Sequence, residues 1–402
     1  MNNLHADLLV AQQSGYPTGG YQPALRCIFT SLDGGTTHDY SSDPTATTNK
    51  LLYVQQAQNK YSDSGVILLQ NNDRSVPADL TGYYVDLGWG LNTASGLKYG
   101  TAPRMWVMHQ GDISGGPKNA KREIYTQFSM VGVWGCVLNT QPVKLPSSPS
   151  TTIPLYRYDE SNYIWGIMGK TIYDVLEYLI ETTLSIQTGL AFTLDALGTQ
   201  DDGQISTVVP FPADGDLLRH INADSPWYFQ TYGDLIISLL KLTKCVLVPR
   251  AGLAFKIVYP QASDEADETY YSSVADGHPF YEVEHRRLNM SPNHIEIFGG
   301  LDEVTGLPTV SGHWYDTDHY SGWVSPAETA TYTGDFMPVQ AFGNTGSELW
   351  DTGFQSDAEC VTRAAELGWQ LKDQILGTRV ILPMDASVEL YDRVEIDDQR
   401  GH

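Results

Sequence analysis

The sequence predicts a mainly β protein of several domains with a small α+β insert. At 402 residues the chain is long enough for two to four domains, each with its own core. Its 37 glycines, 24 tyrosines and 18% charged residues are typical of strands joined by turns, with few long helices. Short alternating apolar runs flank a central section that has helical periodicity, and this order predicts an α+β insert between two β regions.

The first block of the chain, to about Asn139, has short apolar runs separated by turn residues about every ten positions. The turn at 71–75 separates two of these runs, and the segment 145–154, rich in Pro, Ser and Thr, indicates a linker. This pattern predicts a closed or nearly closed barrel. The expected strands are 25–30, 51–58, 65–70, 83–90, 105–110 and 123–138.

The second block, 155–260, has the pattern of a small α+β domain. Thr171 and Asp174 have the spacing of a capping box, and they precede an apolar stripe at helical spacing. A second helix is expected at 232–244. Strand, turn and strand are then expected at 245–248, 249–252 and 253–258. The stripe consists of Val175, Leu176, Leu179 and Ile180.

The third block returns to β-structure and ends in an unfinished hairpin. Strands are expected at 281–288 and 294–298, with Gly299 and Gly300 in a turn, followed by a long excursion at about 301–353. An amphipathic helix from Asp357 and a short strand at 379–382 precede an alternating strand at 387–396. The sequence stops after a turn-prone run, where a return strand is expected. The partner strand is therefore expected from another chain or from residues outside this sequence.

Charge and composition limit the function classes. The formal charge of −24 argues against binding nucleic acid through its phosphates. The four cysteines lie about a hundred residues apart without a CxxC pair, so they are expected to be buried free thiols. No run of about eighteen apolar residues and no signal-peptide pattern is present, so folding in a cytosol without membrane anchoring is expected.

No motif in the sequence predicts catalysis, a cofactor or a metal. The segment 313–319 gathers His313, Asp316, Asp318 and His319, but an aromatic-rich surface loop is the favoured interpretation. The glycine-rich run 111–116 is expected to be a turn, since it contains no Lys and no helix is expected after it. The acidic run 264–268 is expected to be a solvated loop. The chain has 48 Asp and Glu residues, so the sequence does not indicate which two of them could form a carboxylate pair for sugar hydrolysis.

Two separated parts of the sequence resemble the tail hub, or baseplate hub, proteins of tailed bacteriophages. In the first part, a strand that ends in Asn71-Asn72-Asp73 precedes Leu80-Thr81-Gly82-Tyr83-Tyr84-Val85, which is similar to a hub barrel motif. The segments 103–107 and 132–134 continue that pattern. In the second part, 293–299, the following helix and 390–396 are similar to the second hub barrel, with its step Tyr391-Asp392-Arg393-Val394.

The resemblance implies a fold with two tail-tube-like β-barrel domains. The expected domains are 1–150 (first barrel), 151–272 (α+β insert) and 273–402 (second barrel with the long excursion). It also implies a structural virion protein without enzymatic activity, made as a homotrimer that adapts a sixfold tail tube to a threefold tip. The partners implied are a distal tail protein ring, the tape-measure protein and tail-tip or fibre proteins. DNA passes through the channel of such a hub without sequence-specific binding.

The residues expected to matter most are structural. Gly82, Gly88 and Gly90 are expected to permit close backbone turns at the barrel rim.

The alternative function is a carbohydrate-binding or carbohydrate-active β-rich protein, in which Trp and Tyr line a groove. A secreted adhesin is disfavoured by the missing signal peptide. The first barrel core is expected to contain Val85, Leu87, Val107 and Ile124, and Val388, Leu390, Val394 and Ile396 are expected to complete the second barrel.

Overall fold

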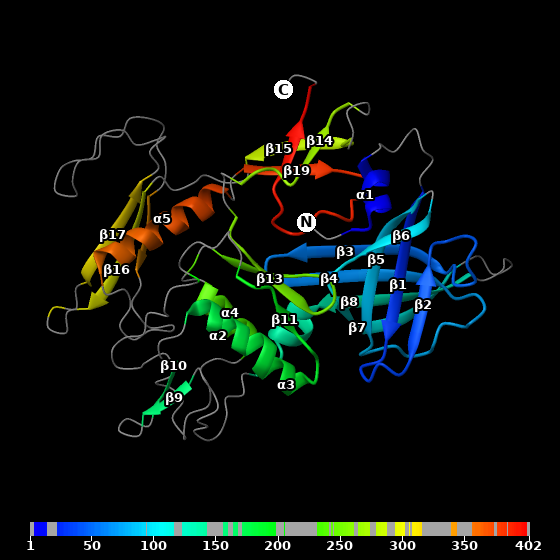
Figure 1. Ribbon diagram of the computed structural model, residues 1–402, viewed down its shortest axis with the longest axis horizontal. Coiled ribbons are helices and arrows are strands. Elements are labelled where there is room, and N and C mark those ends of the chain that lie inside the picture. Colours follow the sequence, from blue (N-terminus) through cyan, green and yellow to red (C-terminus); the bar gives the residue numbers. More distant parts are fainter. Residues whose placement is uncertain are drawn as a thin grey trace.

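The structure is a computed structural model with β-sheet in every third of the chain. Helices of the described residues are concentrated at 172–188, 232–240 and 357–373. The predicted class, mainly β with an α+β insert, is confirmed (Figure 1). The residues described are 4–13, 22–93, 95–115, 123–142, 156–159, 164–167, 171–197, 205, 231–240, 243, 245–260, 264–273, 279–287, 294–301, 305, 308–315, 339–343, 356–373, 376–383 and 385–399.

The first third forms one eight-stranded antiparallel sheet with the order β2-β1-β5-β7-β8-β4-β3, in which β6 pairs with β5. Connections between sequence neighbours join β1 to β2, β3 to β4, β5 to β6 and β7 to β8, whereas the pairs β1–β5 and β4–β8 join strands distant in sequence. The short helix α1 (Ala6–Gln13) packs on β5 and β6 through Leu8, Ala11 and Leu91. The strands are β1 (Pro23–Thr30), β2 (Thr37–Ser41), β3 (Leu51–Asn59), β4 (Ser62–Gln70), β5 (Tyr84–Thr93), β6 (Gly96–Thr101), β7 (Met105–Gly115) and β8 (Glu123–Gly132).

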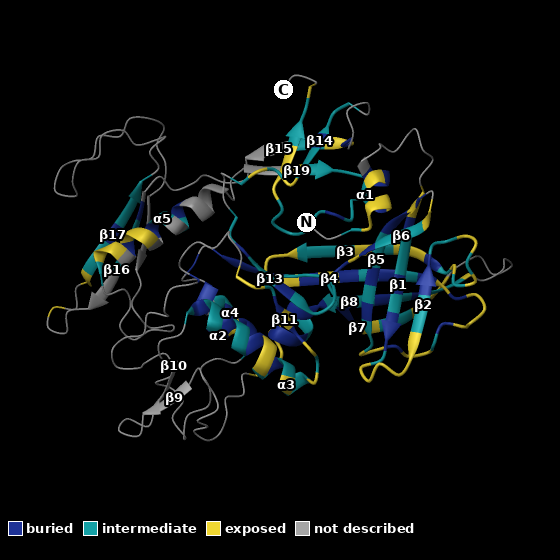
Figure 2. Cartoon of the chain, in the orientation of Figure 1, coloured by how far each residue is buried: buried dark blue, intermediate teal, exposed yellow. Residues whose placement is uncertain are grey.

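This sheet curls around a single apolar core, but its order is open. Alternate residues of the strands point inward, and Phe29 of β1 contacts Phe128 of β8 at a ring-centroid distance of 4.9 Å. The end strands β2 and β3 share no ladder within the described residues; an isolated bridge joins Ser41 of β2 to Asn49 in the segment before β3. The expectation of a closed or nearly closed barrel is thus met by a curled sheet that does not close within the described residues, where β2 contributes only five residues. Figure 2 shows buried residues along the strands of this sheet, interspersed with intermediate and exposed ones.

The middle third is an α+β domain. Its first helical run comprises α2 (Ile172–Glu177), the π-helical η2 (Tyr178–Leu184) and α3 (Ser185–Thr188), and it starts at the predicted capping box of Thr171 and Asp174. Gly189 ends the run in the left-handed conformation, with φ 72°. The helix α4 (Tyr232–Leu240) lies beside a small sheet. That sheet has the order β11 (Thr193–Leu194), β13 (Ala254–Val258), β12 (Val246–Pro249).

One apolar core joins this domain to the first sheet. Trp106 of β7 and Trp134 of the π-helical segment η1 (Trp134–Leu138) are buried in the same cluster as Leu179 and Leu235. The strand expected at 123–138 therefore ends at Gly132, and the residues after it form a helical turn instead. Trp134 is fully buried against the insert, so tertiary packing overrides the β-pattern there.

The last third forms small separate sheets, with no closed barrel in the described residues. β16 (His294–Leu301) lies between β17 (Pro308–Tyr315) and β18 (Val339–Gly343), and α5 (Asp357–Asp373) packs on β16 and β17. In Figure 1 this unit lies at the left, away from the first sheet. The remaining pairs are β14 (Glu268–Tyr271) with β20 (Val394–Asp397), β15 (Glu282–Arg287) with β19 (Leu376–Ile381), and β9 (Tyr156–Asp159) with β10 (Ile164–Ile167).

The predicted strand 387–396 is confirmed only in its last residues, and the expectation that its partner strand comes from outside this sequence is wrong. Only β20 is a strand, and it pairs in parallel with β14 of the same chain. Residues 385–393 instead form an irregular segment, the C-terminal strap, with Tyr391 at φ 71°. Leu390 of the strap packs against Val246, Val248 and Val258 of the α+β domain, and Val394 is exposed. Leu390 and Val394 therefore do not lie together in the core of a second barrel.

Three further expectations need correction. Gly299 and Gly300 lie inside β16 rather than in a turn, because β17 pairs with the strand as far as Leu301. The excursion at 301–353 contains β17 and β18, while its other residues lie mostly outside the described part of the chain. Two strands of the first sheet, β2 and β6, were not expected from the sequence, because both are short and polar.

Candidate functional site

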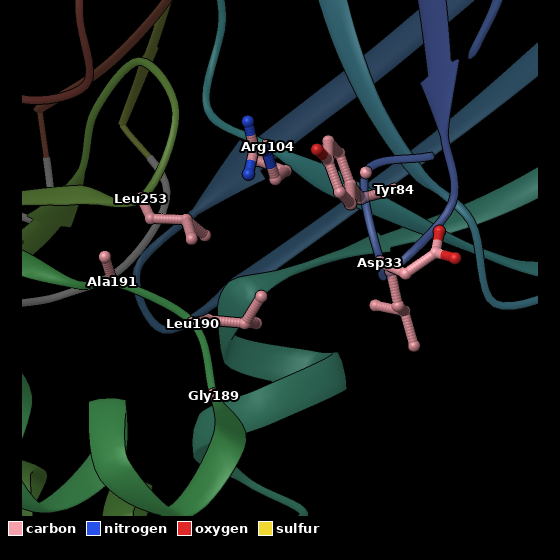
Figure 3. Close-up of a pocket in the computed structure, with 9 residues that line it drawn as sticks. Asp33, Tyr84, Arg104, Gly189, Leu190, Ala191 and Leu253 are labelled. Carbon is pink, nitrogen blue, oxygen red and sulfur yellow. The ribbon is translucent and has the colours of Figure 1, made fainter. Parts of the chain in front are cut away.

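A pocket opens where the first sheet meets the α+β domain. Its volume is about 400 Å³ (Figure 3). The loop between β1 and β2 supplies one wall, the segment after α3 supplies the facing wall, and Arg104 lies between them. The lining residues are Leu32, Asp33, Gly34, Tyr84, Arg104, Gly189, Leu190, Ala191 and Leu253.

Arg104 is held rigidly from three sides. Its Nε and Nη2 donate to the two carboxylate oxygens of Asp86 at 2.9 and 3.0 Å. Its guanidinium lies 3.9 Å from the ring centroid of Tyr84, a cation–π contact. Its backbone N–H donates to the Gly252 carbonyl at 3.2 Å, which joins the sheet to the β12–β13 turn. An arginine in a bidentate ion pair of this kind is better suited to holding neighbouring segments in place than to taking part in catalysis.

The lip of the pocket combines apolar and acidic groups. The Leu32 side chain is 62% exposed, and Gly34 takes φ 71°, which favours glycine. The Ser31 hydroxyl and the Gly35 backbone N–H lower the pKa of the neighbouring Asp33. Asp33 is the only carboxylate among the lining residues, and no Ser, Cys or His accompanies it there. The pocket can therefore receive a side chain of a partner, but its lining offers no nucleophile with a base.

The segment 313–319, considered above as a possible metal site, is a strand and not a loop in its described residues 313–315. His313 and Tyr315 lie in β17, with their rings stacked at 6.1 Å and 10°. The His313 Nε2 lies 3.6 Å from Glu296 Oε1 on the neighbouring strand. The residues 316–319 lie outside the described residues. Within the described residues, no three His, Cys, Asp or Glu side chains gather as metal ligands do.

The other runs noted in the sequence are built into strands. Residues 111–115 belong to β7, so the expected turn is wrong there, and Gly116 lies outside the described residues. The acidic run 264–268 leads into β14, and its Asp267 carboxylate accepts from the Arg393 backbone N–H at 2.9 Å. The expected solvated loop is thus partly a strand anchored to the C-terminal strap.

The motif noted at residues 71–90 has a clear structural role. Asn71 donates from its side-chain amide to Thr126 of β8 at 3.0 Å and accepts from the Val76 backbone N–H at 3.1 Å, so it closes the turn after β4. Gly82 takes φ 85° in the turn before β5, as expected. Gly88 and Gly90 lie within β5 instead of at turns. Val85, Leu87 and Val107 are buried core residues, as predicted, and Ile124 is half-buried.

Sequence reasoning missed the polar contacts that hold the modules together. Arg250 pairs with Asp195 at 2.9 Å and with Glu389 of the strap at 3.0 Å. Asp385 accepts from the Tyr270 hydroxyl at 2.8 Å and from the Gln12 side-chain amide. These partners are separated by 55 to 373 positions. No local pattern in the sequence could have indicated them.

The outer edge of β3 is a candidate assembly surface, which we call the β3 edge. β3 pairs only with β4, so its other edge has no strand partner in the described chain. A register shift between Leu51 and Tyr53 turns Leu51 inward and leaves Leu52 and Tyr53 51% and 48% exposed. A nine-residue edge with apolar side chains favours strand addition by another chain.

These features define a mainly β protein with an unpaired strand edge in its described residues and without an assembled catalytic pair at the described pocket. The fold is shared with a tail protein from Neisseria meningitidis MC58, which is 10% identical, with a TM-score of 0.51 over 95% of this chain and 88% of that one. The prophage MuSo2 43 kDa tail protein from Shewanella oneidensis is 10% identical, with a TM-score of 0.44 over 87% and 77% of the two chains. Comparisons with protein-family models and with curated sequences find no match.

No helix in the described part of the chain is both long and apolar enough to cross a bilayer.

Proposed function

We propose that the chain is a structural virion protein: the homotrimeric hub of a phage tail tip or baseplate. The observation that carries the proposal is the shared fold with the Neisseria meningitidis tail protein over 95% of this chain. In this role the hub adapts a sixfold tail tube to a threefold tip and forms part of the DNA-ejection channel. The protein works as a scaffold, with no enzymatic step and no cofactor.

The β3 edge supports a role in assembly. Strand pairing between copies gives every exposed backbone N–H and C=O of β3 a partner, and it buries Leu52 and Tyr53. In the proposed trimer this edge pairs with a strand of the neighbouring copy. The pocket beside Arg104 then remains available for a different partner.

The charge of the chain supports passage of DNA without capture. With a formal charge of −24, the chain is expected to repel the phosphates of DNA that passes through the trimer. The proposed partners are the distal tail protein ring above, the tape-measure protein within, and tail-tip or fibre proteins below. The proposed location is the virion, after assembly in the host cytoplasm without membrane anchoring.

Native mass spectrometry of the full chain tests the trimer. A mass about three times the 44.5 kDa of one chain is expected at micromolar concentration. Leu52→Glu combined with Tyr53→Glu places charges on the β3 edge and is expected to yield monomers that keep their secondary structure. The matched control is Ile186→Glu, since Ile186 is 78% exposed on the distant helix α3. A monomeric wild-type chain at these concentrations would count decisively against the hub.

A second experiment tests the location. An antibody against the chain, applied to tailed particles and followed by gold labelling, is expected to mark the distal end of the tail. Labelling of capsids, or of no particle, would reject the virion role independently of the oligomeric state.

A further inference from the structure

A second cavity lies at one end of the curled sheet, where its inner face changes from apolar to polar. Along β5 the inward positions Val85 and Leu87 are buried, and Trp89 follows them on the same face. Along β3, Val54 packs against the core, and Gln56 and Gln58 follow at alternate positions. The three polar-tipped side chains line a cavity of about 320 Å³, which the C-terminal strap closes from the other side. This volume is at the small end of ligand sites.

The amides in this cavity have unused hydrogen-bonding capacity. The Trp89 Nε1–H donates to Gln56 Oε1 at 3.2 Å, which fixes the orientation of that amide. The Gln56 Nε2 is then buried and has no hydrogen-bond partner. The Gln58 amide makes no hydrogen bond within the described residues. A buried N–H group without an acceptor costs free energy, and an oxygen placed in the cavity would remove that cost.

The charges in the cavity restrict the ligand. Asp385 and Glu389 line it, and no Lys, Arg or His is among the lining residues. An anionic ligand would therefore be repelled. Arg250 donates from its Nε to Glu389 Oε1 at 3.0 Å and so holds that carboxylate in place as an acceptor.

The aromatic face, the amides and the carboxylates of this cavity together match one chemical class of ligand. A neutral sugar ring has C–H faces that pack on an indole and hydroxyl groups that both donate and accept hydrogen bonds. Trp89 supplies the apolar contact, Gln56 and Gln58 supply amide donors and acceptors, and Asp385 and Glu389 supply acceptors. We propose that this cavity binds a neutral saccharide. Such binding goes beyond the proposed hub role and gives the protein a recognition function of its own.

Calorimetric titration and saturation-transfer NMR with the full chain test the proposal. The probes are neutral oligosaccharides: maltotriose, cellotriose and diacetylchitobiose. At least one is expected to bind with a Kd of about 1 mM or tighter. Gln58→Ala removes one amide and is expected to weaken binding about fivefold, as for a neutral hydrogen bond. Gln55→Ala is the matched control, because Gln55 is the exposed outward-facing neighbour on the same strand.

Three results would overturn the assignment. One is the absence of heat and of saturation transfer for every probe at 10-fold above that expected Kd. Another is equal weakening by Gln55→Ala and Gln58→Ala, which would place the sugar outside the cavity. The third is tighter binding of an acidic saccharide such as sialyllactose, because the two carboxylates exclude it from this site.

Discussion

The rings of Phe29 and Phe128 lie with centroids 4.9 Å apart and planes tilted by 50°, although β5 and β7 separate their strands in the sheet. A flat sheet would keep strands in these positions about 14 Å apart at the usual strand spacing. The contact between Phe29 and Phe128 therefore shows that the sheet is strongly curled. Both side chains are fully buried.

Phe128→Ala is expected to destabilise the first sheet by about 3 to 5 kcal/mol, because it leaves a cavity and removes the ring contact. Urea denaturation followed by circular dichroism measures the change. The control is Ile113→Ala on β7, where the side chain is 47% exposed and the expected change is within about 0.5 kcal/mol. Equal effects of the two substitutions would argue against a curled core.

Gly90→Ala is expected to disrupt the β5–β6 hairpin. A Cβ at Gly90 would lie 1.8 Å from the Lys98 carbonyl oxygen, a backbone atom that can move only with its strand. The expected cost is about 3 kcal/mol or more, beyond ordinary overpacking. Gly82→Ala is the matched control, because Gly82 has open space and only its φ of 85° opposes alanine, for about 1 kcal/mol. Thermal unfolding of both variants gives the comparison, and a smaller loss for Gly90→Ala would contradict the close approach.

Arg250→Met is expected to loosen the C-terminal strap. Arg250 holds Asp195 and Glu389, and Glu389 is only 13% exposed, so it would be left without this cation. A loss of about 2 kcal/mol is expected. Arg26→Met is the control: its pair with Asp39 is about 40% exposed on both sides, so at most about 1 kcal/mol is expected. Limited proteolysis should cut the strap faster only in Arg250→Met, and an intact strap would refute the clamp.

Asp63 of β4 makes stability depend on pH. The residue is 6% exposed, its Oδ2 has no hydrogen-bond partner, and burial raises its pKa to about 6. Because the folded pKa lies above the value of 3.8 for an unperturbed Asp, the folded state binds the proton more tightly. The stability contributed by this group is complete below pH 4 and is lost as the pH rises to about 6.

Asp63→Asn is therefore expected to stabilise the protein by up to about 3 kcal/mol at pH 7 relative to pH 4. The free energy of unfolding is measured for wild type and Asp63→Asn across this pH range. The contributions of the other carboxylates cancel in the difference between the two proteins. Asp43→Asn is the control, since hydrogen bonds from Thr45 lower the pKa of Asp43, the direction opposite to that of Asp63. If the difference in unfolding free energy between Asp63→Asn and wild type did not vary with pH, the pKa of Asp63 would not be raised in the folded state.

The alternating runs of β1, β4 and β5 and the capping box of Thr171 were predictable because each depends on residues close in sequence. The strap was not, since its alternating pattern has the period of a strand while its side chains contact different modules. The candidate pocket was also beyond the sequence. Leu32, Arg104 and Leu190 meet there through docking of two domains.

By itself, the sequence determined the β, α+β, β order, the turns at Asn71 and Gly82 and most of the core of the first sheet. These follow from local backbone preferences and from the period of apolar residues. Only the tertiary structure decided that β20 pairs with β14, that the first sheet curls without closing, and that Gln56, Gln58 and Trp89 face one cavity. Strand pairing and domain docking join residues far apart in sequence, and many pairings satisfy the same local pattern.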